Sequence, residues 1–158
     1  MRTLTIGSVA ASLLAATTLV GPSTAAAVTF PSLTTIYIGV GIRDNAEAGN
    51  AGVATVFNCT NVSGVSVDVR FLVLTFNGAI VANHVQRISH GDTDTVSTDN
   101  TAVFNDGTVL NTGSVNQGAV NIESTQSGVF CTATMVDDVR GLTSIPLVRV
   151  NPHPGTVE

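Results

Sequence analysis

The sequence predicts an all-β protein, a single antiparallel β-sandwich of Greek-key type over residues 28–158, after a cleaved signal peptide over residues 1–27. Three observations lead to this prediction. The N-terminus has the zoned composition of an export signal. The rest of the chain consists of short β-rich runs separated by turn residues, with almost no helix signal. Two cysteines lie far apart on two of these runs, in a chain expected to mature where disulfides persist.

The first 27 residues have three zones in the order that a signal peptide requires. Arg2 supplies a positive charge, residues 4–20 are uncharged and rich in Leu, Ala, Val and Thr, and Ala25 and Ala27 fit a peptidase cleavage site. We therefore expect a mature chain that begins at Val28 and is secreted, to the extracellular space or the periplasm. The alternative is an uncleaved membrane anchor, but an apolar stretch of about 17 residues is at the short limit for a spanning helix.

Eight strands are expected along the mature chain, each a run of β-branched and apolar residues bounded by turn residues. Their predicted ranges are 35–41, 53–60, 66–76, 79–88, 93–98, 118–124, 129–137 and 145–150. Asn77-Gly78 predicts a two-residue hairpin loop between the third and fourth strands, and residues 125–128 predict a second hairpin loop. The run 69–74 is apolar on both faces, which predicts an inner strand.

Cys59 and Cys131 are the only cysteines, and strand alternation tests whether their side chains face the core. Alternation places Cys59 on one face with Phe57, and Cys131 on one face with Ala133. Both cysteines are therefore predicted on the apolar side of a strand, in a structural disulfide that closes about 72 residues and stabilises the fold by roughly 4 kcal/mol. A redox or metal-ligating thiol is the alternative, but there is no Cys-x-x-Cys, and no His lies within ten residues of Cys131.

The order of these features resembles the immunoglobulin-like β-sandwich over most of residues 35–150. The first cysteine lies on an early strand and the second on the penultimate strand. In that fold the bridge joins the two sheets, so the resemblance implies an inter-sheet disulfide. The whole mature chain, with residues 57–61 and 129–133 around the cysteines, also looks like a group of small exported bacterial proteins without an assigned function. That likeness implies a fold and a compartment, and no site.

The charge pattern disfavours two classes of partner. All 6 basic residues are Arg, and removal of Arg2 with the leader leaves 5 Arg against 11 acids, a net charge of −6. Such a chain lacks the basic surface that binds nucleic acid, and it is not attracted to anionic lipid. We therefore expect no nucleic-acid partner and no membrane association after cleavage, and the partner is an unknown protein or surface.

Two groups of residues are candidates for chemistry. Asp92 and Asp94, with Asp99 nearby, could offer carboxylate oxygens to Ca²⁺, although the pattern matches only the first half of a calcium loop. Ser89, His90 and Asp92 superficially look like a hydrolase triad, but adjacent residues on an extended strand point to opposite faces. No residue pattern implies a cofactor.

Three hypotheses for function follow from these observations. The first is a secreted, non-enzymatic β-sandwich that acts as a structural or interaction module. The second is a module that binds a small ligand, in particular Ca²⁺, through the acidic loops. The third is a hydrolase, which requires Ser89, His90 and an Asp to converge in one pocket.

Overall fold

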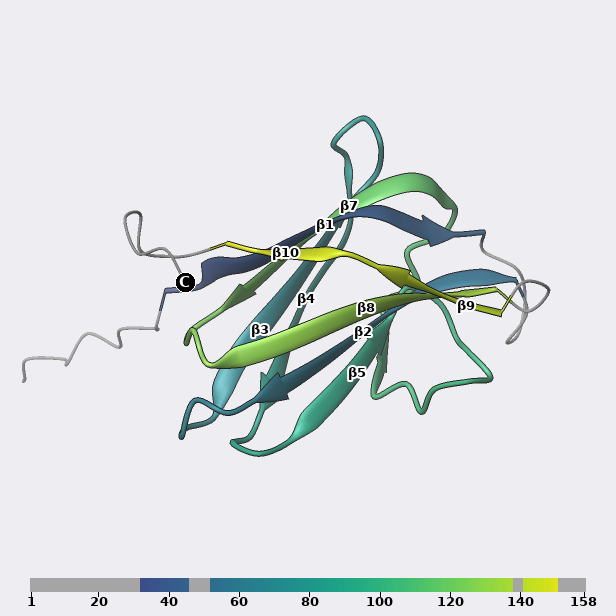
Figure 1. Ribbon diagram of the computed structural model, residues 1–158. Coiled ribbons are helices and arrows are strands. Elements are labelled where there is room, and N and C mark those ends of the chain that lie inside the picture. Colours follow the sequence, from purple (N-terminus) through teal and green to yellow (C-terminus); the bar gives the residue numbers. More distant parts are fainter. Residues whose placement is uncertain (1–31, 46–51, 138–140, 151–158) are drawn as a thin grey trace, which may run out of the picture. The chain divides into compact units, whose positions relative to one another are not determined.

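The structure, a computed structural model, describes residues 32–45, 52–137 and 141–150; the predicted leader, with Val28, lies outside them. Within these ranges, ten strands form two five-stranded sheets (Figure 1). The strands are β1 (Thr34–Asp44), β2 (Val53–Asn61), β3 (Val67–Leu74), β4 (Ile80–Ile88), β5 (Thr93–Ser97), β6 (Thr108–Val109), β7 (Val115–Ser124), β8 (Val129–Asp137), β9 (Gly141–Ile145) and β10 (Leu147–Arg149). In the same ranges, no helix is long and apolar enough to cross a membrane.

The two sheets are named here after their N-terminal long strands. The β1 sheet has the order β10-β1-β7-β3-β4, and the β2 sheet has the order β6-β5-β2-β8-β9. Neighbouring strands are antiparallel except β5 and β6, which form a short parallel pair. The prediction of an all-β sandwich is therefore confirmed, with one parallel pairing that the sequence did not indicate.

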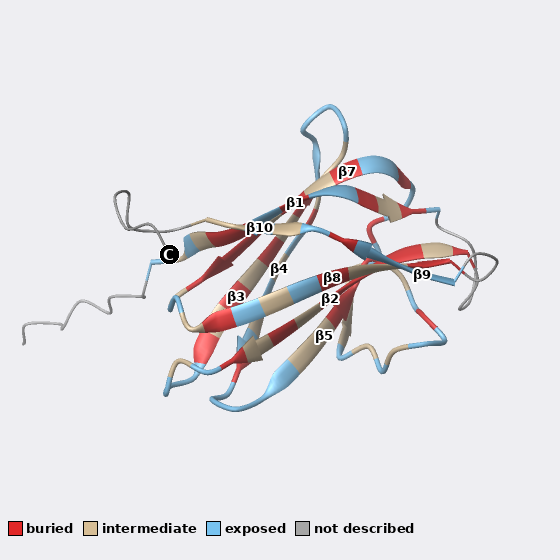
Figure 2. Ribbon diagram, in the orientation of Figure 1, coloured by how far each residue is buried: buried red, intermediate tan, exposed pale blue. Residues whose placement is uncertain are grey.

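The core lies between the two sheets and is built by strand alternation. In β3 every second residue from Val67 to Val73 is buried, and the residues between them are half-buried (Figure 2). Phe71 from β3 meets Phe57 from β2 across the core, with ring centroids 5.7 Å apart. Burying each of these rings stabilises the fold by about 1.5–3 kcal/mol. Because β3 lies between β7 and β4, the prediction of an inner strand at residues 69–74 is confirmed.

The connection from β2 to β5 explains how the sheets are interleaved. The chain leaves β2, forms the β3–β4 hairpin in the other sheet, and returns as β5 to lie beside β2. β2 and β5 are therefore neighbours in one sheet, and β3 and β4 are neighbours in the other. The β3–β4 hairpin is confirmed, but its loop is longer than predicted. Thr75 and Ala79 still bond through their backbones, so the loop has three residues and ends at Gly78, whose φ of 82° suits glycine.

Two predictions are wrong, a hairpin and a strand, because at both places the chain passes from one sheet to the other. Residues 125–128 do not form a hairpin, since β7 belongs to the β1 sheet and β8 to the β2 sheet. The predicted strand 145–150 is divided at Pro146, between β9 in the β2 sheet and β10 in the β1 sheet. Proline has no N–H for a ladder, so it suits the point where the chain leaves one sheet for the other. β6 and most of β9 were not predicted.

The disulfide Cys59–Cys131 is present, but the prediction that it joins the two sheets is wrong. The two cysteines are direct partners in the antiparallel pair of β2 and β8, with Cα atoms 4.1 Å apart. In the immunoglobulin plan, the strands that carry the bridge lie in opposite sheets; here β8 lies beside β2. The facing of the cysteines is as predicted, because Cys59 is buried in the core and Cys131 packs against it.

Contacts between the sheets are non-covalent in the described chain. Besides the core contacts, Thr55 of β2 forms two hydrogen bonds with the backbone of β1. Its hydroxyl donates to the carbonyl oxygen of Arg43 (2.9 Å) and accepts from the Arg43 N–H (3.0 Å). Thr55 is fully buried, so these bonds satisfy a polar group in the interior. The disulfide therefore fixes the register within one sheet, and packing holds the two sheets together.

Candidate functional site

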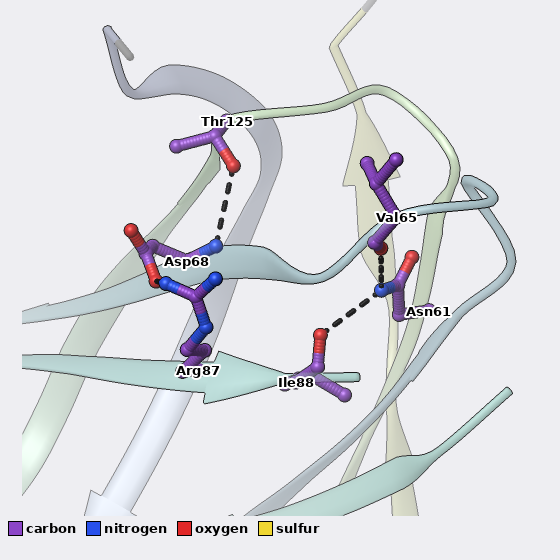
Figure 3. Close-up of polar contacts among 6 residues, drawn as sticks. All are labelled: Asn61, Val65, Asp68, Arg87, Ile88 and Thr125. Carbon is purple, nitrogen blue, oxygen red and sulfur yellow. Dashed lines mark hydrogen bonds and ion pairs between the residues drawn. The ribbon is translucent and has the colours of Figure 1, made fainter. Parts of the chain in front are cut away.

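One end of the sandwich is organised by the buried side chain of Asn61, at the end of β2. Its Nδ2 donates to the carbonyl oxygens of Val65 (2.7 Å) and Ile88 (3.0 Å), as Figure 3 shows. Its Oδ1 accepts hydrogen bonds from the backbone N–H and the hydroxyl of Ser63. Asn61 therefore joins the loop after β2 to the end of β4. Both amide protons are used and the side chain is inaccessible, so its role is structural.

A second set of contacts at this end lies on the β1 sheet. The Asp68 N–H donates to the Thr125 hydroxyl (3.2 Å), and the Asp68 carboxylate lies 3.6 Å from the guanidinium of Arg87 (Figure 3). Arg87 is largely exposed, so this ion pair contributes little to stability. It neutralises two charges at the edge of the sheet.

Ser89, His90 and Asp92 lie in the turn between β4 and β5 at the same end, and all three are exposed. The His90 Nδ1 accepts a hydrogen bond from the Gly64 N–H (3.1 Å). Asp92 closes the turn through its backbone, with its N–H donating to the Ser89 carbonyl (3.1 Å). Among the hydrogen bonds of the described chain, none joins the His90 ring to Ser89 or to a carboxylate, so the arrangement expected of a triad is not assembled.

Asp92, Asp94 and Asp99 are distributed along β5 rather than gathered. Asp92 precedes β5 and Asp99 follows it. Asp94 lies on β5 opposite Cys59, and its side chain is therefore on the core side of the sheet. Asp94 Oδ1 accepts from the N–H of Thr95 (3.0 Å), and Asp99 Oδ1 accepts from that of Asn100 (2.8 Å). Because a strand rises about 3.3 Å per residue, Asp92 and Asp99 are at opposite ends of β5. In the described ranges, no three His, Cys, Asp or Glu side chains gather as a metal site would require.

The outer face of the β2 sheet is rich in hydroxyl groups. Side chains of β5, β2, β8 and β9 that point away from the core form rows across the strands, and two rows are hydrogen-bonded internally: Thr60 to Thr93 (2.7 Å) and Thr95 to Asn58 (2.8 Å). We call this the hydroxyl face. It consists of Asn58, Thr60, Thr93, Thr95, Thr132, Thr134 and Ser144. Phe130 lies at one end of it, with the guanidinium of Arg149 4.6 Å from its ring centroid.

The outer face of the β1 sheet is different in character. Strand pairing places Val148, Ile38, Asn121, Leu72 and Asn83 in one row, and the next row continues with aliphatic side chains. We call this surface the aliphatic face. It consists of Ile38, Val40, Leu72, Leu74, Ile80, Val85, Ala119 and Val148. Of these, Val40 and Val148 are the most exposed, at 64% and 65%.

The charged side chains of the β1 sheet's outer face lie together, toward the end that carries Asn61. Arg70 forms an ion pair with Glu123, which also accepts a hydrogen bond from Asn121 (2.8 Å). Arg87 pairs with Asp68 in the adjacent row. Two cations and two anions therefore form pairs beside the aliphatic face, in a chain whose formal charge is −5.

Sequence reasoning missed the aliphatic face. The signal is present in the run 69–74, where Leu72 and Leu74 alternate with the buried Phe71 and Val73, but that run by itself indicates only an inner strand. β3 is an inner strand within its sheet, yet one of its two faces is the outer surface. Recognising the face required the neighbours of β3, which place Ile38 and Val40 of β1 in the same rows, across β7.

Among the hollows of the described chain that open to solvent, two lie beside strands that carry residues named above. One, of about 430 Å³, lies between β8 and the crossing from β9 to β10, with Cys131, Thr132 and Ser144 in its lining. The other, of about 310 Å³, lies beside the end of β4, with Gln86, Arg87 and Asp94 in its lining. Neither combines a nucleophile, a base and an acid in hydrogen-bond reach, the minimum for acid–base or nucleophilic catalysis.

No known protein family, curated protein or solved structure matches this chain. The likeness to small exported bacterial proteins therefore stays a prediction. Its function is therefore inferred from the architecture, the disulfide and the two outer faces of the protein itself.

Proposed function

We propose that this chain is a secreted, non-enzymatic interaction module, and that it binds a protein partner through the aliphatic face. The observation that carries the proposal is the concentration of exposed aliphatic side chains on one side of one sheet. Of eleven exposed large hydrophobic side chains in the described ranges, five lie on strands of the β1 sheet: Ile38, Val40, Ile80, Val85 and Val148.

An aliphatic outer surface is costly unless it is covered. Soluble monomers rarely expose contiguous apolar patches larger than a few hundred Å², and such patches mark interaction sites. The core does not require this surface, because the opposite sides of the same strands already supply the buried residues. The hydroxyl face shows that a strand surface in the same domain can be polar. The aliphatic composition is therefore best explained by a function in binding.

The face is suited to a protein partner rather than to a charged polymer. The charged side chains of β3, β4 and β7 beside it are paired with one another, so these strands offer neither a cationic track for phosphates nor an array of free carboxylates. A flat apolar centre with a polar margin is the usual composition of a protein interface. Asn83 on the edge strand and the Arg70–Glu123 pair supply polar groups beside the aliphatic side chains, and Asn121 adds one between Ile38 and Leu72.

Site-specific photo-cross-linking tests the proposal. A photoreactive amino acid is placed at Val40 or at Val148 on the aliphatic face, and at Thr132 on the hydroxyl face as the matched control, in chains secreted by the native host. We expect both aliphatic positions to yield a cross-linked product with the same protein, and the Thr132 position to yield none. Equal products from both faces, or none from either aliphatic position, would overturn the proposal.

The calcium hypothesis is retained only as a prediction to be tested, since no observation favours it. Its residues lie along β5 and its flanking turns, and each of Asp94 and Asp99 accepts a backbone hydrogen bond from its neighbour. The hydrolase hypothesis has no assembled triad to support it.

A further inference from the structure

β4 is a long edge strand that no other strand of the described chain covers. It spans nine residues, Ile80–Ile88, and pairs with β3 on one side only. Alternate residues of such a strand direct their N–H and C=O groups away from the sheet, where they are available to another strand. The hollow of about 310 Å³ beside Gln86 and Arg87 shows that the space next to the end of this edge is open.

β4 lacks the devices by which proteins usually protect an edge. It contains no Pro, no Gly and no Lys, and its one charged residue, Arg87, is paired with Asp68. Edge strands of native proteins commonly carry an inward-pointing charge, a β-bulge or a proline, each of which hinders pairing with another chain. The irregularity in the β3–β4 ladder lies at its turn end, between Val73 and Leu74, and leaves the rest of β4 regular.

The sequence of β4 is complementary to itself about Val85. In an antiparallel pairing of two copies with Val85 opposite its equivalent, residues whose numbers sum to 170 are partners. Asn83 then faces Arg87, and His84 faces Gln86, so polar side chains meet polar ones. On the inner side Ala82 faces Ile88, and both are apolar and buried in the single chain. Such matching about a centre favours a second copy over an unrelated strand.

We propose that two copies of this chain form a two-fold symmetric dimer by antiparallel pairing of β4 with β4, centred on Val85. The pairing joins two β1 sheets into one continuous ten-stranded sheet. It covers the β4 edge of both copies. It also places the two aliphatic faces side by side, each beside its paired charges. This inference concerns the β4 edge and does not rest on the proposed binding through the aliphatic face.

Cysteine cross-linking tests the pairing directly. Val85→Cys places a thiol on the two-fold axis, where opposing Cα atoms of an antiparallel pair lie about 4.5–5.5 Å apart, within disulfide range. Val148→Cys is the matched control, since Val148 is at least as exposed and lies at the opposite edge of the same sheet. On mild oxidation we expect the Val85→Cys chain to form a covalent dimer at least tenfold faster than the control. Equal rates would overturn the proposal.

A pair of charge substitutions at Asn83 tests the register. Asn83 is exposed, so both variants are expected to fold, which far-ultraviolet circular dichroism verifies. Asn83→Glu places two ion pairs with Arg87 across the axis and is expected to lower the dimer dissociation constant roughly fivefold, whereas Asn83→Arg opposes like charges and raises it by a similar factor. Sedimentation velocity measures both. A chain that stays monomeric at every concentration, or variants that shift the constant equally, would refute the pairing.

Discussion

The two outer faces of this sandwich differ in composition on strands of the same kind, although the outer face of the β2 sheet also carries Phe130 and Leu142. On the hydroxyl face, Thr60, Thr93 and Thr95 form hydrogen-bonded rows with their neighbours. On the aliphatic face, Ile38, Val40 and Val148 project into solvent at 45–65% exposure. Threonine, valine and isoleucine all favour strands because they are β-branched, so either composition forms a sheet. Strand propensity therefore does not account for the difference between the two faces.

The two sheets also differ in how they are held. The β2 sheet has a covalent link between its central strands, Cys59–Cys131. The β1 sheet has none in the described chain and instead carries the Arg70–Glu123 and Arg87–Asp68 pairs on its outer face. The sheet with the polar outer face is thus the covalently fixed one, and the sheet proposed for binding depends on packing and hydrogen bonds. Four predictions test this comparison.

The largest effect is expected from removing the covalent link. The double substitution Cys59→Ala and Cys131→Ala should lower the free energy of unfolding by roughly 4 kcal/mol, because the unfolded chain gains the freedom of a loop of 72 residues. Guanidinium unfolding measures the loss, and the wild-type chain in reductant serves as the control. If reduction leaves the unfolding midpoint unchanged, the β2 sheet does not depend on its disulfide.

The next effect concerns the end where the two sheets meet. Asn61→Ala should cost about 2–3 kcal/mol, because the buried carbonyl groups of Val65 and Ile88 lose their donor. Asn58→Ala, on the hydroxyl face of the same strand, removes one partly buried bond to Thr95 and should cost about 1 kcal/mol or less. Equal losses in thermal or chemical unfolding would contradict the structural role given to Asn61.

Lysine substitutions on the two outer faces are expected to change stability little but to change surface hydrophobicity differently. Val40→Lys and Thr132→Lys should each change the free energy of unfolding by no more than about 0.5 kcal/mol, since both side chains are exposed. Val40→Lys should shorten retention in hydrophobic interaction chromatography much more than Thr132→Lys does. Similar shifts from both variants would remove the distinction between the faces.

The smallest effect is expected from calcium. Asp92 and Asp99 flank β5 at opposite ends, so they cannot bind one ion together, and the thermal midpoint should be the same in millimolar Ca²⁺ and in EDTA. A midpoint that rises with Ca²⁺ and returns with EDTA would support the small-ligand alternative.

Local patterns predicted much of the fold because alternation is written into neighbouring residues. The facing of Cys59 and Cys131, the inner strand around Val69 and the hairpin at Asn77-Gly78 each depend on a few consecutive positions. The same patterns failed at Pro146 and at residues 125–128, where the chain changes sheets. The aliphatic face was not predicted, because it depends on which strands are neighbours, whereas the acids and His90 can be named from residue type alone.

The sequence by itself determined that this chain forms strands, which side of each strand is apolar, and that its two cysteines face the core. Only the tertiary structure decided that β8 lies beside β2, so that the disulfide links two strands of one sheet. It also decided that Ile38, Leu72 and Val148 share one surface. The physical reason is that alternation follows from the geometry of one strand, whereas pairing depends on contacts between residues far apart in the chain.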